Sequence, residues 1–262
     1  MTDAHVAYHA QNGVARLTLT QLARLNAMSF DMWASLPALV ARAEADADVR
    51  VIELRGAGER AFCAGADISQ FGERRTGDDA VQAYEDAVAA AMAAVSEAEK
   101  PSVARVRGVA FGGGLALALC CDLRFGETTA RLRIPAARLG LGYAFANVEA
   151  LVARLGLGPA SDLLLSARAI DGCEGERLGV FNKAWAPEAF EREADAAVAA
   201  IASNAPLTLK ALKFALRQCA KPFDARDRAA ADALVAACFR SDDYQEGQAA
   251  FREKREPRFR GA

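Results

Sequence analysis

Three consecutive glycines, Gly112, Gly113 and Gly114, stand where a predicted strand meets a predicted apolar helix. Glycine has no Cβ atom, so a ligand can approach the backbone of such a turn closely. The first N–H groups of the helix have no partner within it, and the helix dipole adds partial positive charge there. The pattern therefore predicts a place for an anion, or for an oxygen that becomes negative during a reaction. A tight strand-to-helix connection without a ligand is the alternative, and the glycines alone favour it.

A second run of small residues favours the oxyanion site over a connection without a ligand. Residues 61–68 read AFCAGADI and follow the predicted buried strand 49–54. Backbone N–H groups from two such turns can surround one oxygen atom. Paired backbone donors at an oxygen that becomes negative are the device that acyl-transfer and enolate chemistry needs.

These stretches resemble motifs of the enoyl-CoA hydratase/isomerase (crotonase) superfamily. The resemblance rests on AFCAGADI at 61–68, GVAFGGGLALALCCD at 108–122, and SDDYQEG at 241–247 followed by AFREKR at 250–255. It runs from about Val14 to the end of the chain. It implies an α/β fold, a spiral of ββα units followed by C-terminal helices that form a homotrimer, often a dimer of trimers. It also implies an acyl-CoA substrate. Coenzyme A is then part of the substrate, and no further cofactor is expected.

The resemblance assigns roles to individual residues. It implies that the N–H groups of Ala66 and Gly113 form an oxyanion hole, with a thioester enolate or a related oxyanion as the species they stabilise. Substrate or coenzyme A contacts are expected at Arg24, Ala64, Asp67, Ile68, Gly112 and Lys254, and the Lys254 contact can be made to the coenzyme A of a neighbouring subunit. Three simpler interpretations stay open: Arg24 as an exposed solubilising side chain, Asp67 as a cap or turn residue, and Lys254 as part of a solvated charged face.

The chain departs from the family where hydratases carry two glutamates that serve as general base and general acid. Those positions correspond here to Ala116 and Ala136. Alanine can neither orient water nor give a proton, so hydration is doubtful, and so is isomerisation that relies on the second glutamate. Decarboxylation, thioester hydrolysis, or acyl-CoA binding without catalysis are the alternatives.

Three other residues near these motifs can carry chemistry. Tyr143 lies where the family's decarboxylase branch has a functional tyrosine, although an aromatic core or lid residue fits equally well. Glu149 is either a displaced base or a solvent-facing acid favoured by the helix dipole. Cys63 is either a nucleophile or a small packing residue, and the lack of a nearby histidine to activate it favours packing.

Composition limits the alternatives. The chain has 262 residues, a hydrophobic content of 53% and a net charge of −2. A net charge this close to zero does not indicate binding to nucleic acid or to an anionic membrane. No apolar run approaches the roughly 20 residues of a membrane span. Both histidines, His5 and His9, lie in the N-terminal segment, which argues against a Ser-His-Asp hydrolase and a zinc site. The six cysteines form no CxxC pair, so a reduced, cytoplasmic setting is expected, without a metal.

Periodicity predicts the elements that position these residues. Strands are predicted at 14–20, 49–54, 102–106, 123–125 and 131–134, a helix after the N-cap Ser29 that Pro37 interrupts, and a helix at 80–98. Residues 71–79 are predicted to form a loop at the edge of the site. Helical patterns dominate from Ala189 onward, so we expect an α/β core with the acyl-CoA site at 1–204 and a helical oligomerisation region at 205–262.

Overall fold

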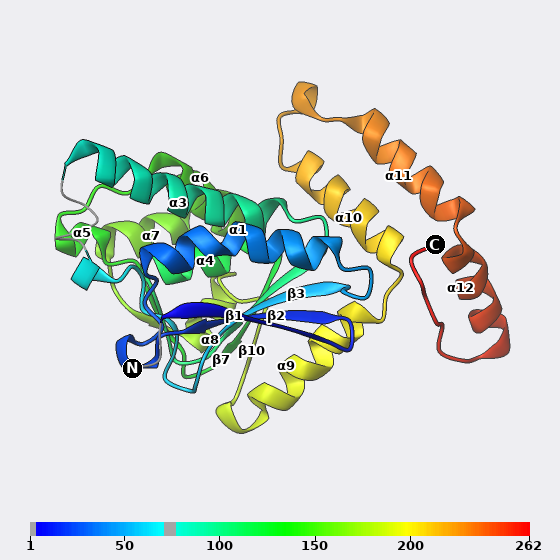
Figure 1. Ribbon diagram of the computed structural model, residues 1–262, viewed down its shortest axis with the longest axis horizontal. Helices are drawn as coiled ribbons and strands as arrows, with labels where there is room; N and C mark the ends of the chain where they lie inside the picture. The colour runs from blue at the N-terminus through cyan, green and yellow to red at the C-terminus, as the bar shows by residue number, and fades with distance from the viewer. Residues whose placement is uncertain (1–3, 71–76) are drawn as a thin grey trace.

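Two β-sheets with helices around them form the body of the structure, a computed structural model that describes residues 4–70 and 77–262 (Figure 1). The larger sheet has six strands: β1 (His5–Gln11), β2 (Val14–Thr20), β3 (Val51–Gly56), β5 (Ser102–Val106), β7 (Leu123–Glu127) and β10 (Lys183–Trp185). They lie in the order β1-β2-β3-β5-β7-β10. The β1–β2 pair is antiparallel and every later pair is parallel.

The smaller sheet has four strands: β4 (Ala61–Cys63), β6 (Val109–Phe111), β8 (Arg131–Arg133) and β9 (Ile170–Asp171). Here β4 pairs with β6 and β6 with β8 in parallel, while β9 is antiparallel to β8. Because β4, β6 and β8 run in the same direction, the turns that follow them leave the same edge of this sheet.

Helices cover both faces of the larger sheet. The helices before residue 205 are α1 (Phe30–Ala45), α3 (Asp78–Glu97), α4 (Gly113–Cys120), α5 (Ala136–Leu139), α6 (Phe145–Leu155), α7 (Leu157–Ser166), α8 (Gly172–Arg177) and α9 (Pro187–Ala202), with short 3₁₀ turns η1 (Leu22–Arg24) and η2 (Ile68–Gln70). Figure 1 shows α1 and α3 side by side on one face and α9 on the other.

Burial explains why the strands are apolar. In β2, Leu17 and Leu19 are fully buried and alternate with half-exposed residues, as a strand with one face in the core requires. In β3, Val51, Ile52 and Leu54 are all buried, because helices cover both faces of a parallel sheet.

The face under α9 also contains buried charges. Glu53 is fully buried in β3, and its carboxylate lies 2.8 Å from Nε of Arg105 in β5. Arg105 also reaches Glu191 of α9 at 2.7 Å. A buried charge is tolerated when it is paired and hydrogen-bonded, so these ion pairs hold α9 over the sheet.

The helix that begins after Ser29 is confirmed. The Ser29 Oγ accepts a hydrogen bond from the Met32 N–H at 3.2 Å, the N-cap contact that was predicted. The helix continues through Pro37 to Ala45, so Pro37 does not end it. Of the predicted loop 71–79, residues 71–76 lie outside the described residues, and α3 begins at Asp78.

The last helices are α10 (Pro206–Cys219), α11 (Arg228–Arg240) and α12 (Asp242–Glu253), with the 3₁₀ turn η3 (Phe223–Ala225). Figure 1 shows them at one end of the molecule, beyond the sheets. The boundary expected between residues 204 and 205 falls in the turn from α9 to α10, and the division into two domains stays a prediction. Within the described ranges, no helix is long and apolar enough to cross a membrane.

Two positively charged side chains of α10, Lys213 and Arg217, bind it to the rest of the chain. The Lys213 Nζ lies 2.6 Å from the Asp122 carboxylate and donates to the Lys100 carbonyl at 2.7 Å. Arg217 donates to the carbonyls of Ser96, Glu97 and Ala98 at the C-terminal end of α3. These contacts satisfy carbonyls that a helix end leaves without partners.

Candidate active site

A cavity of about 230 Å³ lies where β4, β6 and β8 end. Its floor comes from the turn after β4, including Ala64 and Ala66, and from Gly112 and Gly113 after β6. The residues after β8, Pro135 and Ala136, form one side, and residues 139–147 continue it. Faces of α1 and α3 complete the wall. The three parallel strands therefore bring segments far apart in the sequence to one place.

The N–H of Ala66 is directed away from its own strand partner. Residue 66 forms a parallel bridge with Met28: the Met28 N–H donates to the Gly65 carbonyl at 2.7 Å, and the Asp67 N–H donates to the Met28 carbonyl at 2.9 Å. In this pattern the flanking residues bond to Met28, and the N–H of Ala66 itself points to the opposite side. Among the described residues it has no acceptor.

The N–H of Gly113 is the first of α4. An N–H at this position has no partner within its own helix, and none of the described residues accepts its hydrogen bond. The preceding Gly112 has φ +49°, a conformation that suits glycine and turns the chain from β6 into the helix. Residues 114–119 of α4 are buried, so the helix is fixed firmly behind the turn.

The two turns touch. A Cβ atom on Gly65 would lie 3.1 Å from the Phe111 carbonyl oxygen and 3.7 Å from the Gly113 nitrogen. A Cβ atom on Gly113 would lie 3.9 Å from the Ala66 nitrogen. The glycines therefore permit this close approach, and two N–H groups that have no acceptor within residues 4–70 and 77–262 border the same cavity.

Asp67 stabilises the turn that carries Ala66. Its side chain is 4% exposed and accepts hydrogen bonds from Arg24 Nη1 at 3.1 Å, Gln21 Nε2 at 2.9 Å and the Ser69 hydroxyl at 2.7 Å. Burial alone would raise the pKa of Asp67, but these hydrogen bonds and the Arg24 charge together hold that pKa below its ordinary value. Asp67 is not among the cavity-lining residues, so the geometry supports the turn-residue interpretation.

Other residues singled out in the sequence lie in different surroundings. Ile68 is 73% exposed at the cavity rim. The Arg24 side chain lies outside the cavity lining. It is half exposed, and its Nη1 contacts the Asp67 carboxylate. Lys254 is exposed at the C-terminal end of α12 and does not line the cavity of its own chain.

Tyr143 lines the cavity, and Glu149 does not. The Tyr143 hydroxyl is buried and has no hydrogen-bond partner among the described residues. Burial, with a smaller effect from nearby Cys120, raises the pKa of Tyr143 to about 12. Tyr143 is therefore neutral near pH 7, and its hydroxyl can donate or accept a hydrogen bond. Glu149 is exposed and outside the cavity lining.

Cys63 is a packing residue. It is fully buried in β4, and burial raises the pKa of its thiol to about 12. A cysteine reacts as the thiolate, so this thiol is inert at neutral pH. The residue packs against α4 so tightly that a Cβ atom on Gly114 would lie 2.4 Å from the Cys63 carbonyl oxygen.

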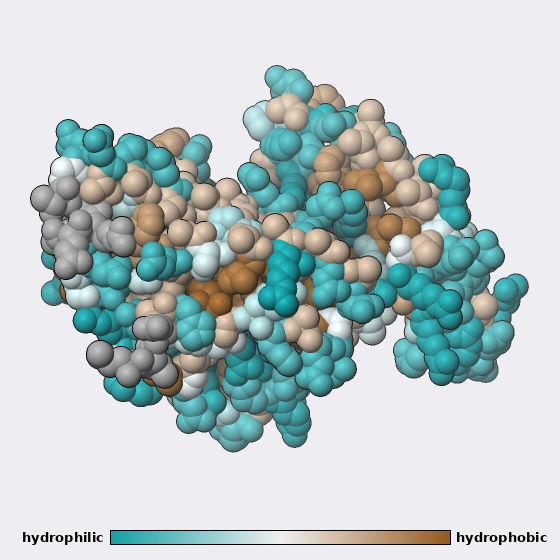
Figure 2. Space-filling model, viewed as in Figure 1, coloured by the Kyte–Doolittle hydropathy of each residue, from teal (hydrophilic) through white to brown (hydrophobic). Residues whose placement is uncertain are grey.

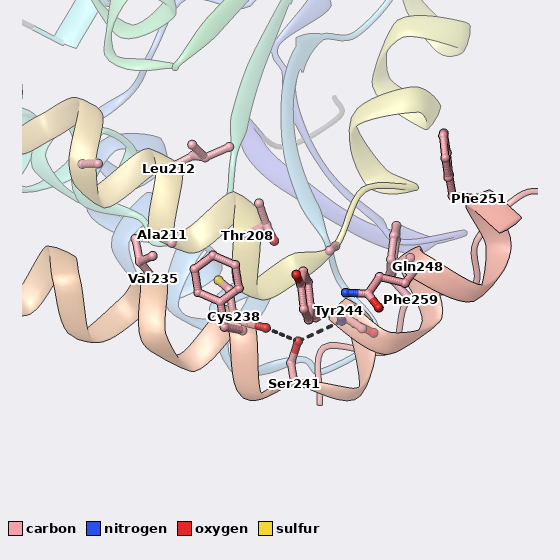
Figure 3. A pocket seen from close by; sticks show the side chains of 15 residues that line it. Thr208, Ala211, Leu212, Val235, Cys238, Ser241, Tyr244, Gln248, Phe251 and Phe259 are labelled. Carbon is pink, nitrogen blue, oxygen red and sulfur yellow. Dashed lines mark hydrogen bonds between the residues drawn. The ribbon is translucent and has the colours of Figure 1, made fainter.

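A second hollow lies between α10, α11 and α12. It measures about 570 Å³, and its side chains include Leu212, Val235, Tyr244 and Phe251 (Figure 3). The Ser241 hydroxyl in its wall already donates to the Cys238 carbonyl at 2.7 Å and accepts from the Tyr244 N–H at 3.1 Å. Figure 2 shows further apolar surface over these helices. This hollow offers an apolar surface rather than reacting groups.

Comparisons with known proteins agree with this arrangement. The sequence model of the enoyl-CoA hydratase/isomerase family matches residues 9–262. The chain belongs to the enoyl-CoA hydratase/isomerase family. It is 30% identical over 253 residues to the short-chain-enoyl-CoA hydratase of Clostridium acetobutylicum, covering 96% of this chain and 95% of that protein. It is 31% identical over 262 residues to the crotonyl-CoA hydratase of Syntrophomonas wolfei, covering 99% of both.

Solved structures show the same fold for this family member. An enoyl-CoA hydratase/carnithine racemase from Magnetospirillum magneticum superposes with a TM-score of 0.92 at 29% identity, covering 100% of this chain and 97% of that one. The predicted α/β crotonase fold is confirmed, with two mixed sheets and C-terminal helices.

The cavity of this family member has alanine at both positions where the resemblance predicts the loss of a family glutamate. Ala116, 6% exposed in α4, and Ala136 at the start of α5 both line the cavity. The cavity wall also includes Trp33 from α1 and Tyr84, Glu85, Val88 and Met92 from α3, which the sequence did not mark as site residues. The helical spacing of 85, 88 and 92 was a usable signal for one face of α3.

Proposed function

We propose that this protein is an acyl-CoA enzyme that stabilises a thioester enolate with the backbone N–H groups of Ala66 and Gly113. The observation that carries the proposal is the pair itself: two amides without acceptors among the described residues, from separate turns, at one cavity. Removing one donor of such a pair typically costs about 2.7–4 kcal/mol of transition-state stabilisation.

The second part of the proposal concerns the reaction that the protein catalyses. The relatives named above are hydratases, so enoyl-CoA thioesters are the first substrates to test. The alanines at 116 and 136 favour a reaction that needs a stabilised oxyanion without that glutamate pair: the enolate of a decarboxylation, or the tetrahedral intermediate of thioester hydrolysis. The neutral Tyr143 hydroxyl at the cavity supports decarboxylation, because it can donate a hydrogen bond that orients the substrate carboxylate before this group leaves as CO₂.

Turnover assays test this proposal. The purified protein is incubated with crotonyl-CoA, longer enoyl-CoAs and methylmalonyl-CoA, and the products are identified by mass spectrometry. Turnover of at least one thioester above the uncatalysed rate is expected. If no thioester reacts, the catalytic proposal is wrong.

A relative that binds acyl-CoA without catalysis is the second candidate, and the same two alanines favour it. It predicts affinity for acyl-CoA in calorimetry together with no turnover. Absence of any binding would contradict both candidates.

For coenzyme A we propose contacts at Ala64, Ile68 and Gly112, which line the cavity, together with Arg24 outside the lining and Lys254 supplied by a neighbouring subunit. The last contact requires assembly through the region 205–262 into a homotrimer or a dimer of trimers. Exposed apolar side chains there, Leu216 at 71% and Phe251 at 87%, support such an assembly. Light scattering after size-exclusion chromatography tests it, and a monomer at micromolar concentration would contradict it.

A further inference from the structure

One charged side chain lines the cavity among the described residues, and it belongs to Glu85 of α3. The remaining lining residues are apolar or neutral. Neither turn that holds the paired amides contributes a carboxylate to the cavity. The carboxylate at this cavity therefore comes from a helix that the sequence motifs do not include.

The packing of α3 directs Glu85 to this place. Tyr84 is 1% exposed, and its ring centroid lies 6.3 Å from that of Phe30 in α1, which fixes the rotation of the helix. Glu85, Val88 and Met92 follow at helical spacing and all three line the cavity. Val88 and Met92 form apolar wall, and Glu85 supplies the charge at the exposed, N-terminal end of this stripe.

An enolate that forms from a saturated acyl thioester by loss of a proton requires a base close to the acyl carbon. Neither Ala116 nor Ala136 can serve, and the pKa of about 12 of the Tyr143 hydroxyl leaves it protonated at neutral pH. We propose that Glu85 is the general base that takes a proton from the acyl carbon next to the thioester and returns it. This inference rests on the proposed function, because it uses the same cavity and the same paired amides.

The step balances without a further reactant. The Glu85 carboxylate takes the proton, the C–H electron pair becomes the carbon–carbon double bond of the enolate, and the carbonyl oxygen becomes negative beside the Ala66 and Gly113 amides. Return of the proton to the same carbon regenerates the thioester, and in D₂O it introduces deuterium. Because Glu85 stands at the exposed end of the wall, its proton exchanges with solvent between the two steps.

Deuterium incorporation into butyryl-CoA in D₂O, followed by mass spectrometry, tests the proposal. General-base catalysis contributes about 10²–10⁴-fold to rate, so Glu85→Gln is expected to slow incorporation by about 10²-fold or more, with butyryl-CoA affinity in calorimetry unchanged. Glu85→Ala is expected to recover part of its rate when formate is added. Asp86→Asn is the matched control: Asp86 is the next residue, is exposed, and lies outside the cavity lining.

The outcomes separate the two proposals. Wild-type protein that incorporates deuterium, with Glu85→Gln within twofold of it, would overturn the role of Glu85 and leave the paired amides intact. Equal losses in Glu85→Gln and Asp86→Asn would overturn it as well, since a general charge effect would then explain both. Wild-type protein that binds no acyl-CoA would contradict the proposed function, and the inference with it.

Discussion

Gly113 faces Ala66 so closely that a Cβ atom on the glycine would lie 3.9 Å from the Ala66 nitrogen. The first residue belongs to the turn after β6 and the second to the turn after β4, and the parallel pairing of these strands brings them together. Small residues at both positions leave space for an oxygen atom between the two amides. The following predictions test what this space is for.

Replacing Gly113 by alanine places a methyl group at the edge of this space. The other nearest contact of that methyl would be Trp33 Cζ2 at 3.5 Å, an ordinary van der Waals distance, so the variant is expected to fold. Turnover of the acyl-CoA substrate is expected to fall on the order of 10²-fold, the scale of losing one oxyanion donor. Steady-state kinetics and thermal melting measure the two effects. Undiminished turnover would mean that no oxygen occupies this space.

Gly114→Ala is expected to destabilise the fold. Its Cβ atom would lie 2.4 Å from the Cys63 carbonyl oxygen and 2.7 Å from the Cys63 Cβ, so α4 must move away from β4. Overpacking of this kind costs about 1–3 kcal/mol, more than the roughly 1 kcal/mol that alanine gains over glycine in a helix. Urea unfolding measures the change.

Gly158→Ala is the matched control for both glycine variants. Gly158 is exposed near the start of α7, and a Cβ atom there would meet nothing within 4 Å. This variant should be at least as stable as the wild type. If the Gly114→Ala protein were as stable as the Gly158→Ala protein, α4 and β4 would not be in tight contact.

Asp67→Asn is expected to lower stability at neutral pH and much less in acid. The pKa of Asp67 is held below its ordinary value, so its ionised form contributes stability above about pH 4, and this contribution is lost as the pH falls through the lowered pKa. Hydrogen bonds to a charged group contribute about 1.5–3 kcal/mol. Free energies of unfolding at pH 7 and at about pH 3, for wild type and variant, test this. If the difference in free energy of unfolding between wild type and Asp67→Asn were larger in acid than at pH 7, the pKa of Asp67 would not be lowered in the folded protein.

Glutamates at 116 and 136 are expected to create hydratase activity. Both alanines line the cavity, so carboxylates there would face the substrate that the paired amides hold. The Ala116→Glu/Ala136→Glu protein should hydrate crotonyl-CoA faster than the wild type in a spectrophotometric assay. A folded double variant without any gain would mean that these positions do not correspond to the family's glutamates.

The local parts of the fold were predictable from the sequence. Strand β2 has the bounds that its alternation of apolar and polar residues predicted, and Ser29 caps α1. Strand β1 was missed, although Asn12 and Gly13, both at positive φ, form the turn between β1 and β2. An Asn-Gly pair between two strands is a strong hairpin signal, and it was available in the sequence.

The cavity wall was less predictable than its floor. The motifs of small residues at 61–68 and 108–122 identified Ala66 and Gly113 through the family resemblance. The role of Glu85 depends on which neighbours α3 meets in the folded chain, and helical spacing identifies a face without naming its partner. The role of Asp67 was left open for the same reason, because its hydrogen bonds come from Gln21 and Arg24, far away in the sequence.

A crystal structure of the complex with butyryl-CoA tests the central claim most directly. The account predicts that the thioester oxygen lies about 2.7–3.1 Å from the nitrogens of both Ala66 and Gly113. A thioester oxygen bound elsewhere, or in contact with only one of the two amides, would contradict it.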